Sequence, residues 1–331
     1  MIDQANPMPA ENVPNAFHAG ERAMQQTVSV AERMAQVGEQ VLRDHMPLQH
    51  RVFFTQLPFV VVGSVDAAGQ PTASILAVPP GFVSSPDERS LHIAAHAQLA
   101  DPLAANLRVG ASLGVLGIEP HTRRRNRANG IVTALNDEGI TLGIQQSFGN
   151  CPKYIQAREP EFDAKRVPGP ARVSVGLDPQ AVRLIEQADT FFIASAHSDA
   201  THHMAESMQR SHGVDVSHRG GKPGFVRVDA NGMLIVPDFR GNFFFNTLGN
   251  LLVNPQAGLL FIDFDSGDLL QLEALAEIIT EGAELASFVG AERLLRLRVT
   301  RVLWRPGALA LRWGEPIYSP SLEGLGGWPQ S

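Results

Sequence analysis

The strongest constraint on the fold is an internal repeat. The tetrapeptide PGFV occurs at 80–83 and again at 223–226 of this 331-residue chain. An Asn-Leu pair at 106–107 is followed by ASLGVLGIE, and a second pair at 250–251 is followed by QAGLLFIDF. A unit that recurs within one chain indicates two copies of one small domain. The alternative is that the halves merely share a common strand–helix–strand pattern.

Hairpin signals recur in both halves. FFTQLPFVVVGSVDAAGQPTASILAV predicts two strands around a turn at Asp66–Gly69, and GIVTALNDEGITLGIQQ predicts a hairpin that turns at Asn136–Gly139. FVRVDANGMLIVPDF predicts a hairpin around Asp229–Gly232, because Asn-Gly is a preferred two-residue turn. We therefore expect a mainly β protein with peripheral helices, built as two tandem split β-barrels.

Helix signals are short and lie between these strands. An amphipathic pattern within 15–50 predicts an N-terminal helix. Asp101 followed by Pro102 is typical of a helix start, and Asp178 is a candidate N-cap for the helix LDPQAVRLIEQA. NTLGNLLVNP, which begins at Asn246, predicts one more short helix.

The domain boundaries follow from composition and from the repeat. Residues 1–15 are polar and contain proline, so we expect a disordered N-terminus. Residues 16–156 hold the N-terminal helix and the first barrel, and 157–180 form a proline-rich linker. The second barrel is expected over 181–315, followed by a C-terminal tail over 316–331.

Composition narrows the classes of partner and compartment. The formal net charge is −7, which argues against a general nucleic-acid-binding surface. The single cysteine, Cys151, excludes an internal disulfide and fits a reducing compartment. We find no signal-peptide pattern and no apolar run long enough to span a bilayer. We expect a soluble cytoplasmic protein that does not bind membranes.

The densest cluster of charge is TRRRNRANG at 122–130. Strand alternation would place Arg123, Arg125 and Arg127 on one face and Arg124 with Asn126 on the other. Guanidinium groups stay charged and match phosphate or carboxylate in shape. The cluster therefore predicts an anion site, and the alternative is a solvated hairpin that balances the acidic surface.

Two further segments carry polar groups suited to a ligand. VSHRGG at 216–221 offers Ser217, His218 and Arg219 beside two glycines that allow close backbone approach. The expected helix at Asn246 could bind an anion through its free N–H groups, or Asn246 could be a plain N-cap. The segment QSFGNCPKYIQAR places Cys151 in a polar stretch without histidine. We therefore interpret Cys151 as part of the wall of a binding groove. The alternatives are a nucleophile and a structural thiol.

Four segments resemble pyridoxamine 5'-phosphate oxidase-like proteins, which have the FMN-binding split-barrel fold. They are TRRRNRANG, QSFGNCPKYIQAR, GVDVSHRGGKPGFVRVD at 213–229 and PDFRGNFFFNTLGNLLVNPQAGLLFIDF at 237–264. The chain looks similar to a two-barrel subfamily of these proteins. The resemblance implies an FMN site where two barrels meet, usually across a homodimer. The expected cofactor-binding residues are Arg123, Arg125, Arg127, Asn129, Ser147, Asn150, Cys151, Lys153, Tyr154, Ser217, Arg219, Asp238, Phe239, Asn242, Asn246 and Thr247.

The function implied by this resemblance is an FMN-dependent oxidoreductase. Hydride would pass from a small organic substrate or a reduced nicotinamide to the flavin, and then to oxygen or another acceptor. His218 is the candidate catalytic base, since imidazole titrates near neutrality. No metal site is expected. We expect a homodimer that acts on a small molecule.

A second hypothesis is a non-catalytic or repurposed protein that binds flavin or haem. The chain departs from the family pattern at Thr72, Ala274 and Leu275, which favours this alternative. The segment THHMAESMQRSH at 201–212 contains three histidines and two methionines, which can ligate haem iron. We interpret this segment as a surface loop between two strands, with a haem or metal site as its alternative.

Overall fold

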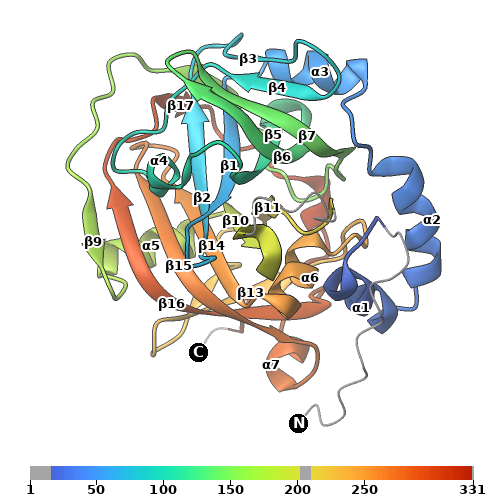
Figure 1. Ribbon diagram of the computed structural model, residues 1–331. Coiled ribbons are helices and arrows are strands. Elements are labelled where there is room, and N and C mark those ends of the chain that lie inside the picture. The colour runs from blue at the N-terminus through green and yellow to red at the C-terminus, as the bar shows by residue number, and fades with distance from the viewer. Residues whose placement is uncertain (1–15, 202–209, 330–331) are drawn as a thin grey trace.

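The computed structural model describes residues 16–201 and 210–329 (Figure 1). The chain begins with three helices where the sequence predicted one: α1 (Ala19–Thr27), α2 (Ala31–Val41) and α3 (Leu48–Thr55). Two local features divide them. Ser29 has a left-handed backbone with φ of 56°, which separates α1 from α2, and Pro47 precedes α3. The expected amphipathic helix corresponds to α2.

The first barrel is a seven-stranded antiparallel sheet. Its strands lie in the order β2-β1-β5-β6-β7-β4-β3, and the helix α4 (Pro102–Asn106) precedes β5. Asp101 caps α4 by accepting a hydrogen bond from Leu103 N, as the Asp-Pro signal predicted. The strands are β1 (Phe59–Val65), β2 (Pro71–Ala77), β3 (Val83–Ser84), β4 (Ser90–Ile93), β5 (Ser112–Glu119), β6 (Arg124–Asn136) and β7 (Gly139–Gly149).

The second barrel repeats this path strand for strand, in the order β11-β10-β14-β15-β16-β13-β12. The helix α6 (Asn246–Val253) precedes β14, as α4 precedes β5. The internal repeat is therefore confirmed, and so are the predicted hairpins. The strands are β10 (Thr190–Ala196), β11 (Val214–Gly220), β12 (Arg227–Val228), β13 (Met233–Asp238), β14 (Gln256–Ile262), β15 (Leu269–Ile279) and β16 (Arg293–Arg305).

The repeated Asn-Leu pairs have the same structural role. Asn106 Nδ2 donates to Ser64 Oγ at 3.0 Å and to Thr72 Oγ1 at 3.3 Å. Its counterpart Asn250 donates to Ser195 Oγ at 3.2 Å and to Asp215 Oδ2 at 3.0 Å. Each buried asparagine thus ties a helix to the first hairpin of its own barrel.

The segment between the barrels is not free of structure. β8 (Pro160–Phe162) pairs with β17 (Leu311–Trp313), and β9 (Arg172–Ser174) pairs with β16. The helix α5 (Pro179–Gln187) follows, and Asp178 caps it by accepting from Ala181 N at 2.7 Å. The short helix α7 (Ala283–Ala286) lies between β15 and β16.

The two barrels pack against each other through strands that are buried on both faces. Every residue of β1 and of β10 is buried. A core cluster joins Phe59, Val61 and Leu116 of the first barrel to Phe192 and Leu260 of the second. This packing explains why FVVVGSV and TFFIASA are nearly continuous apolar runs instead of alternating ones.

Close backbone contacts fix how the elements meet. A Cβ on Gly114 of β5 would lie 2.5 Å from Val214 O of the other barrel. A Cβ on Gly20 of α1 would lie 2.2 Å from Gly249 O of α6, so these two helices cross at a glycine pair. In the described part of the chain, no helix is both long and apolar enough to cross a membrane.

Candidate functional site

One groove lies between the barrels and has walls from both. The first barrel contributes the start of β6 and residues 150–154, and the second contributes β11, the end of β13, the loop 240–245 and the start of α6. It encloses about 870 Å³ of non-protein space, including solvent at its mouth.

The groove is strongly positive. Arg125, Arg127, Arg219 and Arg293 line it together with Lys153, and Asp238 is the one carboxylate among the described lining residues. Asp238 pairs with both Arg219 and Arg293. In a chain with a net charge of −7, this concentration of guanidinium groups is the kind of arrangement that anion-binding sites use.

The guanidinium group of Arg125, which lines the groove, donates hydrogen bonds to backbone carbonyl groups. Its Nε donates to Cys151 O at 2.8 Å and its Nη1 to His218 O at 3.4 Å. Burial, together with the charge of Arg127, lowers the pKa of Arg125 to about 10. Carbonyl oxygens do not neutralise the guanidinium, so an anion in the groove would supply the missing charge.

Arg127 is held by a buried network that joins the barrels. Its Nη1 lies 2.6 Å from Asp215 Oδ1, and its Nη2 donates to Ser217 Oγ. Asn129 Nδ2 donates to the same Asp215 oxygen at 2.8 Å. The network presents Ser217 Oγ and Thr247 Oγ1, which lie 2.9 Å apart, to the groove.

The N-terminus of α6 opens into the groove. Asn246, Thr247 and Leu248 all line it, and the N-cap residue Phe245 offers no side-chain cap. Asn246 is therefore not the N-cap, and its Nδ2 instead donates to the buried Glu21 of α1. Burial and the nearby Asp215 raise the pKa of Glu21 well above its usual value. The first backbone N–H groups of α6 remain available to an anion.

Aromatic rings form the rest of the wall. Tyr154, Phe239, Phe243 and Phe245 line the groove, and Tyr154 packs on Phe239 with ring centroids 5.2 Å apart. Tyr154, Phe243 and Phe245 have φ values of 65°, 65° and 60°. Left-handed backbone is costly for aromatic residues and is found preferentially at ligand sites. Flat apolar surface thus adjoins the anion-binding groups.

His218 lines the groove but is held in its neutral form. Its side chain is buried, and burial together with Arg125 and Arg219 lowers its pKa well below the usual value. Its Nδ1 has no hydrogen-bond partner within the described chain. A neutral imidazole with such a low pKa is a weak base, although it can still exchange one hydrogen bond with a ligand.

The structure brings most of the predicted site residues together. Three lie elsewhere. Arg123 donates to the carbonyls of Ile155 and Ile317, Asn129 binds Asp215 behind the wall, and Ser147 Oγ lies 3.0 Å from His50 Nδ1. The predicted residues that line the groove are Arg125, Arg127, Asn150, Cys151, Lys153, Tyr154, Ser217, His218, Arg219, Asp238, Phe239, Asn242, Asn246 and Thr247.

Among the contributors to the site that the sequence analysis missed, four bear on its chemistry. Arg293 lies on β16, far along the chain from the arginine cluster, and Phe243 and Phe245 looked like ordinary apolar residues. Asp215 stands at the repeat position of Thr72, since each is the cross-strand partner of the equivalent serine in its barrel. An alignment of the two repeats would have revealed this exchange of a hydroxyl group for a carboxylate group from the sequence alone.

The repeat creates a second, equivalent position between the barrels, and there the chain fills the space itself. Asp101 caps α4 at the place where Phe245 leaves α6 uncapped. Asp101 also accepts from Ser74 Oγ and pairs with the buried Arg305. Gln271 takes the place of Arg127 and donates to Ser74 Oγ at 3.3 Å.

This self-filled position leaves little room for a ligand. The space beside Thr72 and Gln271 is about 240 Å³, whereas the open groove measures about 870 Å³ on the same basis. Thr72 lies at this position, and Ala274 lies in the core of the second barrel. Neither these two residues nor Leu275 lines the open groove. The three departures from the family pattern therefore leave the lining of the open groove unchanged.

The structure describes only part of the histidine-rich segment at 201–212. His202 and His203 lie outside the described residues. His212 is buried rather than part of a surface loop, and it contacts Asp199.

Comparison with known proteins supports the fold. Residues 46–175, which contain the first barrel from β1 to β7, match the family model described as pyridoxamine 5'-phosphate oxidase. A search of curated proteins finds no match.

Three solved structures resemble part of the chain. HupZ of Group A Streptococcus is 14% identical, with a TM-score of 0.28 over 38% of this chain and 92% of its own. HutZ of Vibrio cholerae, described as a haem storage protein, is 15% identical, with a TM-score of 0.27 over 40% and 95%. A FAD-binding protein of Mesorhizobium loti is 11% identical, with a TM-score of 0.25 over 41% and 97%.

The neutral state of His218 predicts a pH-dependent stability. The folded state keeps His218 neutral, whereas the unfolded chain protonates it below about pH 6.5. The unfolded state then binds more protons, so the free energy of unfolding falls as the pH falls. Between pH 7.5 and 5.5 the wild-type chain should lose more stability than His218→Gln, by at most about 1.4 kcal/mol, the value for an imidazole that stays neutral throughout in the folded state. Urea unfolding at both pH values measures this difference, and His121→Gln at an exposed site is the control. Equal losses in wild type and His218→Gln would contradict the prediction.

Proposed function

We propose that this chain, whose first barrel belongs to the pyridoxamine 5'-phosphate oxidase family, binds FMN in the open groove and acts as an oxidoreductase. The observation that carries the proposal is the excess of guanidinium groups beside an uncapped helix N-terminus and a wall of aromatic rings. A phosphate monoester needs the first two features, and a flat isoalloxazine ring fits the third.

Residues of both barrels would hold the cofactor. The phosphate would lie at the start of α6, where Ser217 and Thr247 offer hydroxyl groups and Arg127 offers charge. Tyr154, Phe243 and Phe245 would pack against the ring system, and Arg125 would balance negative charge near Cys151. When bound, FMN supplies the capacity to accept a hydride and pass its electrons on.

The groove favours one of the two hydride sources. Oxidation of an alcohol or amine requires a base that removes a proton, and the histidine among the lining residues, His218, is a weak base. A reduced nicotinamide gives up hydride without loss of a proton at the donor carbon. We therefore favour a reduced nicotinamide as donor, with His218 as a hydrogen-bonding group instead of the catalytic base.

The second candidate function is a carrier that binds flavin or haem without turnover. The lowered pKa of His218, the one histidine among the described lining residues, favours it over an oxidase of organic substrates. Both functions use the same groove, whose walls come from one chain. Homodimerisation and a cytoplasmic location stay predictions.

Replacement of Arg125 tests the anion site. Arg125→Gln should weaken FMN binding by about 10- to 100-fold, because a charge-assisted contact contributes about 1.5–3 kcal/mol. Arg124→Gln is the matched control, since Arg124 is the exposed neighbour on the same strand and stacks on Phe53. Fluorescence titration with FMN and with riboflavin measures both variants. Riboflavin should bind more weakly than FMN to the wild type, and equal affinities would refute a phosphate site.

The same titration gives the number of sites. We expect saturation at one FMN per chain, because Asp101 and Arg305 already occupy the equivalent position of the second groove. Isothermal calorimetry with a chain concentration from absorbance measures the ratio. A ratio of two would show that the second groove opens to ligand.

Turnover separates the enzyme from the carrier. The FMN-loaded chain should oxidise reduced nicotinamide in air faster than the same concentration of free FMN, as followed by nicotinamide absorbance. A chain that holds FMN tightly but gives no rate above free FMN would support the carrier. A purified chain with a sharp haem band and no affinity for FMN would contradict the proposal and support haem binding.

A further inference from the structure

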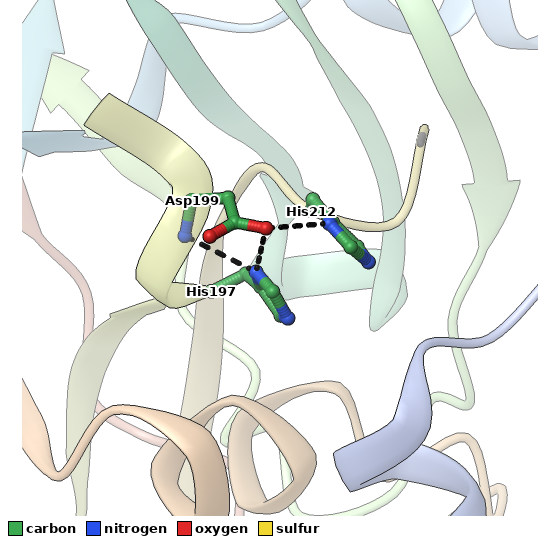
Figure 2. Close-up of side chains that lie close together, drawn as sticks. All are labelled: His197, Asp199 and His212. Atoms are coloured by element: carbon green, nitrogen blue, oxygen red, sulfur yellow. Dashed lines mark hydrogen bonds and ion pairs between the residues drawn. The ribbon is translucent and has the colours of Figure 1, made fainter. Parts of the chain in front are cut away.

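Three potential metal ligands meet at the base of one hairpin, away from the groove. His197 directly follows β10, Asp199 lies in the short 3₁₀ turn Ser198–Thr201, and His212 lies just before β11 (Figure 2). One ligand atom from each residue lies within 4.8 Å of the other two. Figure 2 shows both imidazole rings turning Nδ1 toward the carboxylate.

This cluster is an addition to the repeated fold. In the first barrel, the equivalent strands β1 and β2 are joined by a short turn in which Asp66 Oδ1 accepts from Ala68 N and Gln70 N. In the second barrel, the connection runs from His197 to Gly213, whose backbone atoms are hydrogen-bonded at 3.1 Å. The three side chains close this longer connection at its base. None of the three residues lies in a strand or lines the groove.

We propose that His197, Asp199 and His212 bind a divalent transition metal ion of the Zn²⁺ class. Imidazole nitrogen and carboxylate oxygen are common Zn²⁺ ligands, with bonds of about 2.0–2.2 Å. Tetrahedral ligands at that distance lie about 3.3 Å from one another. The Oδ2 atom of Asp199 is 3.1 Å from His212 Nδ1 and 3.6 Å from His197 Nδ1.

The surroundings suit an ion that enters from the solvent side. Both histidine side chains are buried, whereas the Asp199 side chain is 49% exposed. His18 packs its ring edge-on against both, with centroids 5.0 Å from His197 and 6.3 Å from His212. This packing restrains the rings from the inner side. A water molecule would complete the coordination at the exposed side.

Binding requires a small rearrangement of the rings. They stack with centroids 3.8 Å apart and planes 16° from parallel, and His197 Nδ1 accepts from Asp199 N at 3.2 Å. The rings must tilt so that both lone pairs converge on one ion, and His197 must release the Asp199 N–H group. The bound ion would then tie the ends of the connection together.

Metal titration of the untagged chain tests the proposal. The chain is stripped with a chelator, dialysed and titrated with Zn²⁺ in a calorimeter, and bound metal is measured by mass spectrometry. We expect one Zn²⁺ per chain, a rise in Tm on binding, and visible absorption of a tetrahedral site when Co²⁺ replaces Zn²⁺. A stripped wild-type chain that takes up no Zn²⁺ would overturn the proposal and leave Asp199 as a plain partner of two histidines.

Matched variants locate the site. Asp199→Asn and His212→Ala should each lower Zn²⁺ affinity by at least about tenfold, since even loss of an outer-shell partner costs that much. Glu119→Gln is the control, because Glu119 Oε2 lies 4.0 Å from a single imidazole, that of His121, outside the connection 197–213. Circular dichroism and a cooperative urea transition confirm folding of each variant. Unchanged affinity in the folded Asp199→Asn variant would refute the assignment, whatever the result for FMN.

Discussion

The buried ion pair between Arg127 and Asp215 is the interaction on which the rest of the site depends. It joins β6 of the first barrel to β11 of the second at 2.6 Å, with both side chains largely removed from water. Loss of one partner from such a pair costs about 3–5 kcal/mol, because the other charge is left buried and uncompensated. The pair also sets the direction of Ser217 and anchors Asn250 of α6. The groove has this shape because the ion pair fixes the position of one barrel relative to the other.

Divergence of the two repeats explains why one groove is open and the other closed. In the closed position the protein supplies its own anion, Asp101, at a helix start, and its own cation, Arg305. In the open position Phe245 leaves the equivalent helix start uncapped. Because both positions present a helix start beside an equivalent serine, Ser74 or Ser217, the groups that fill the closed position indicate which ligand chemistry would suit the open one. That chemistry is a negative group held by arginine and serine.

Much of the fold could be predicted from local patterns. The hairpins, the Asp101 and Asp178 caps and the alternation that separates Arg124 from Arg125 depend on neighbours in sequence, and the structure agrees with them. The single N-terminal helix was wrong because its breaks lie in backbone geometry at Ser29 and in Pro47. Arg123 did not join its neighbours because it lies in a left-handed turn before β6.

The sequence by itself determined the repeat, the β architecture and the residue types of the candidate site, because strand periodicity and turn chemistry are short-range effects. Only the tertiary structure decided which copies of the repeated residues face open space. It paired Arg127 with Asp215, added Arg293 from a distant strand and buried His218 among arginines. It also gathered His197, Asp199 and His212 at one point. Charge, burial and ligand geometry depend on distances between segments remote in sequence, and the packing of the two barrels sets those distances.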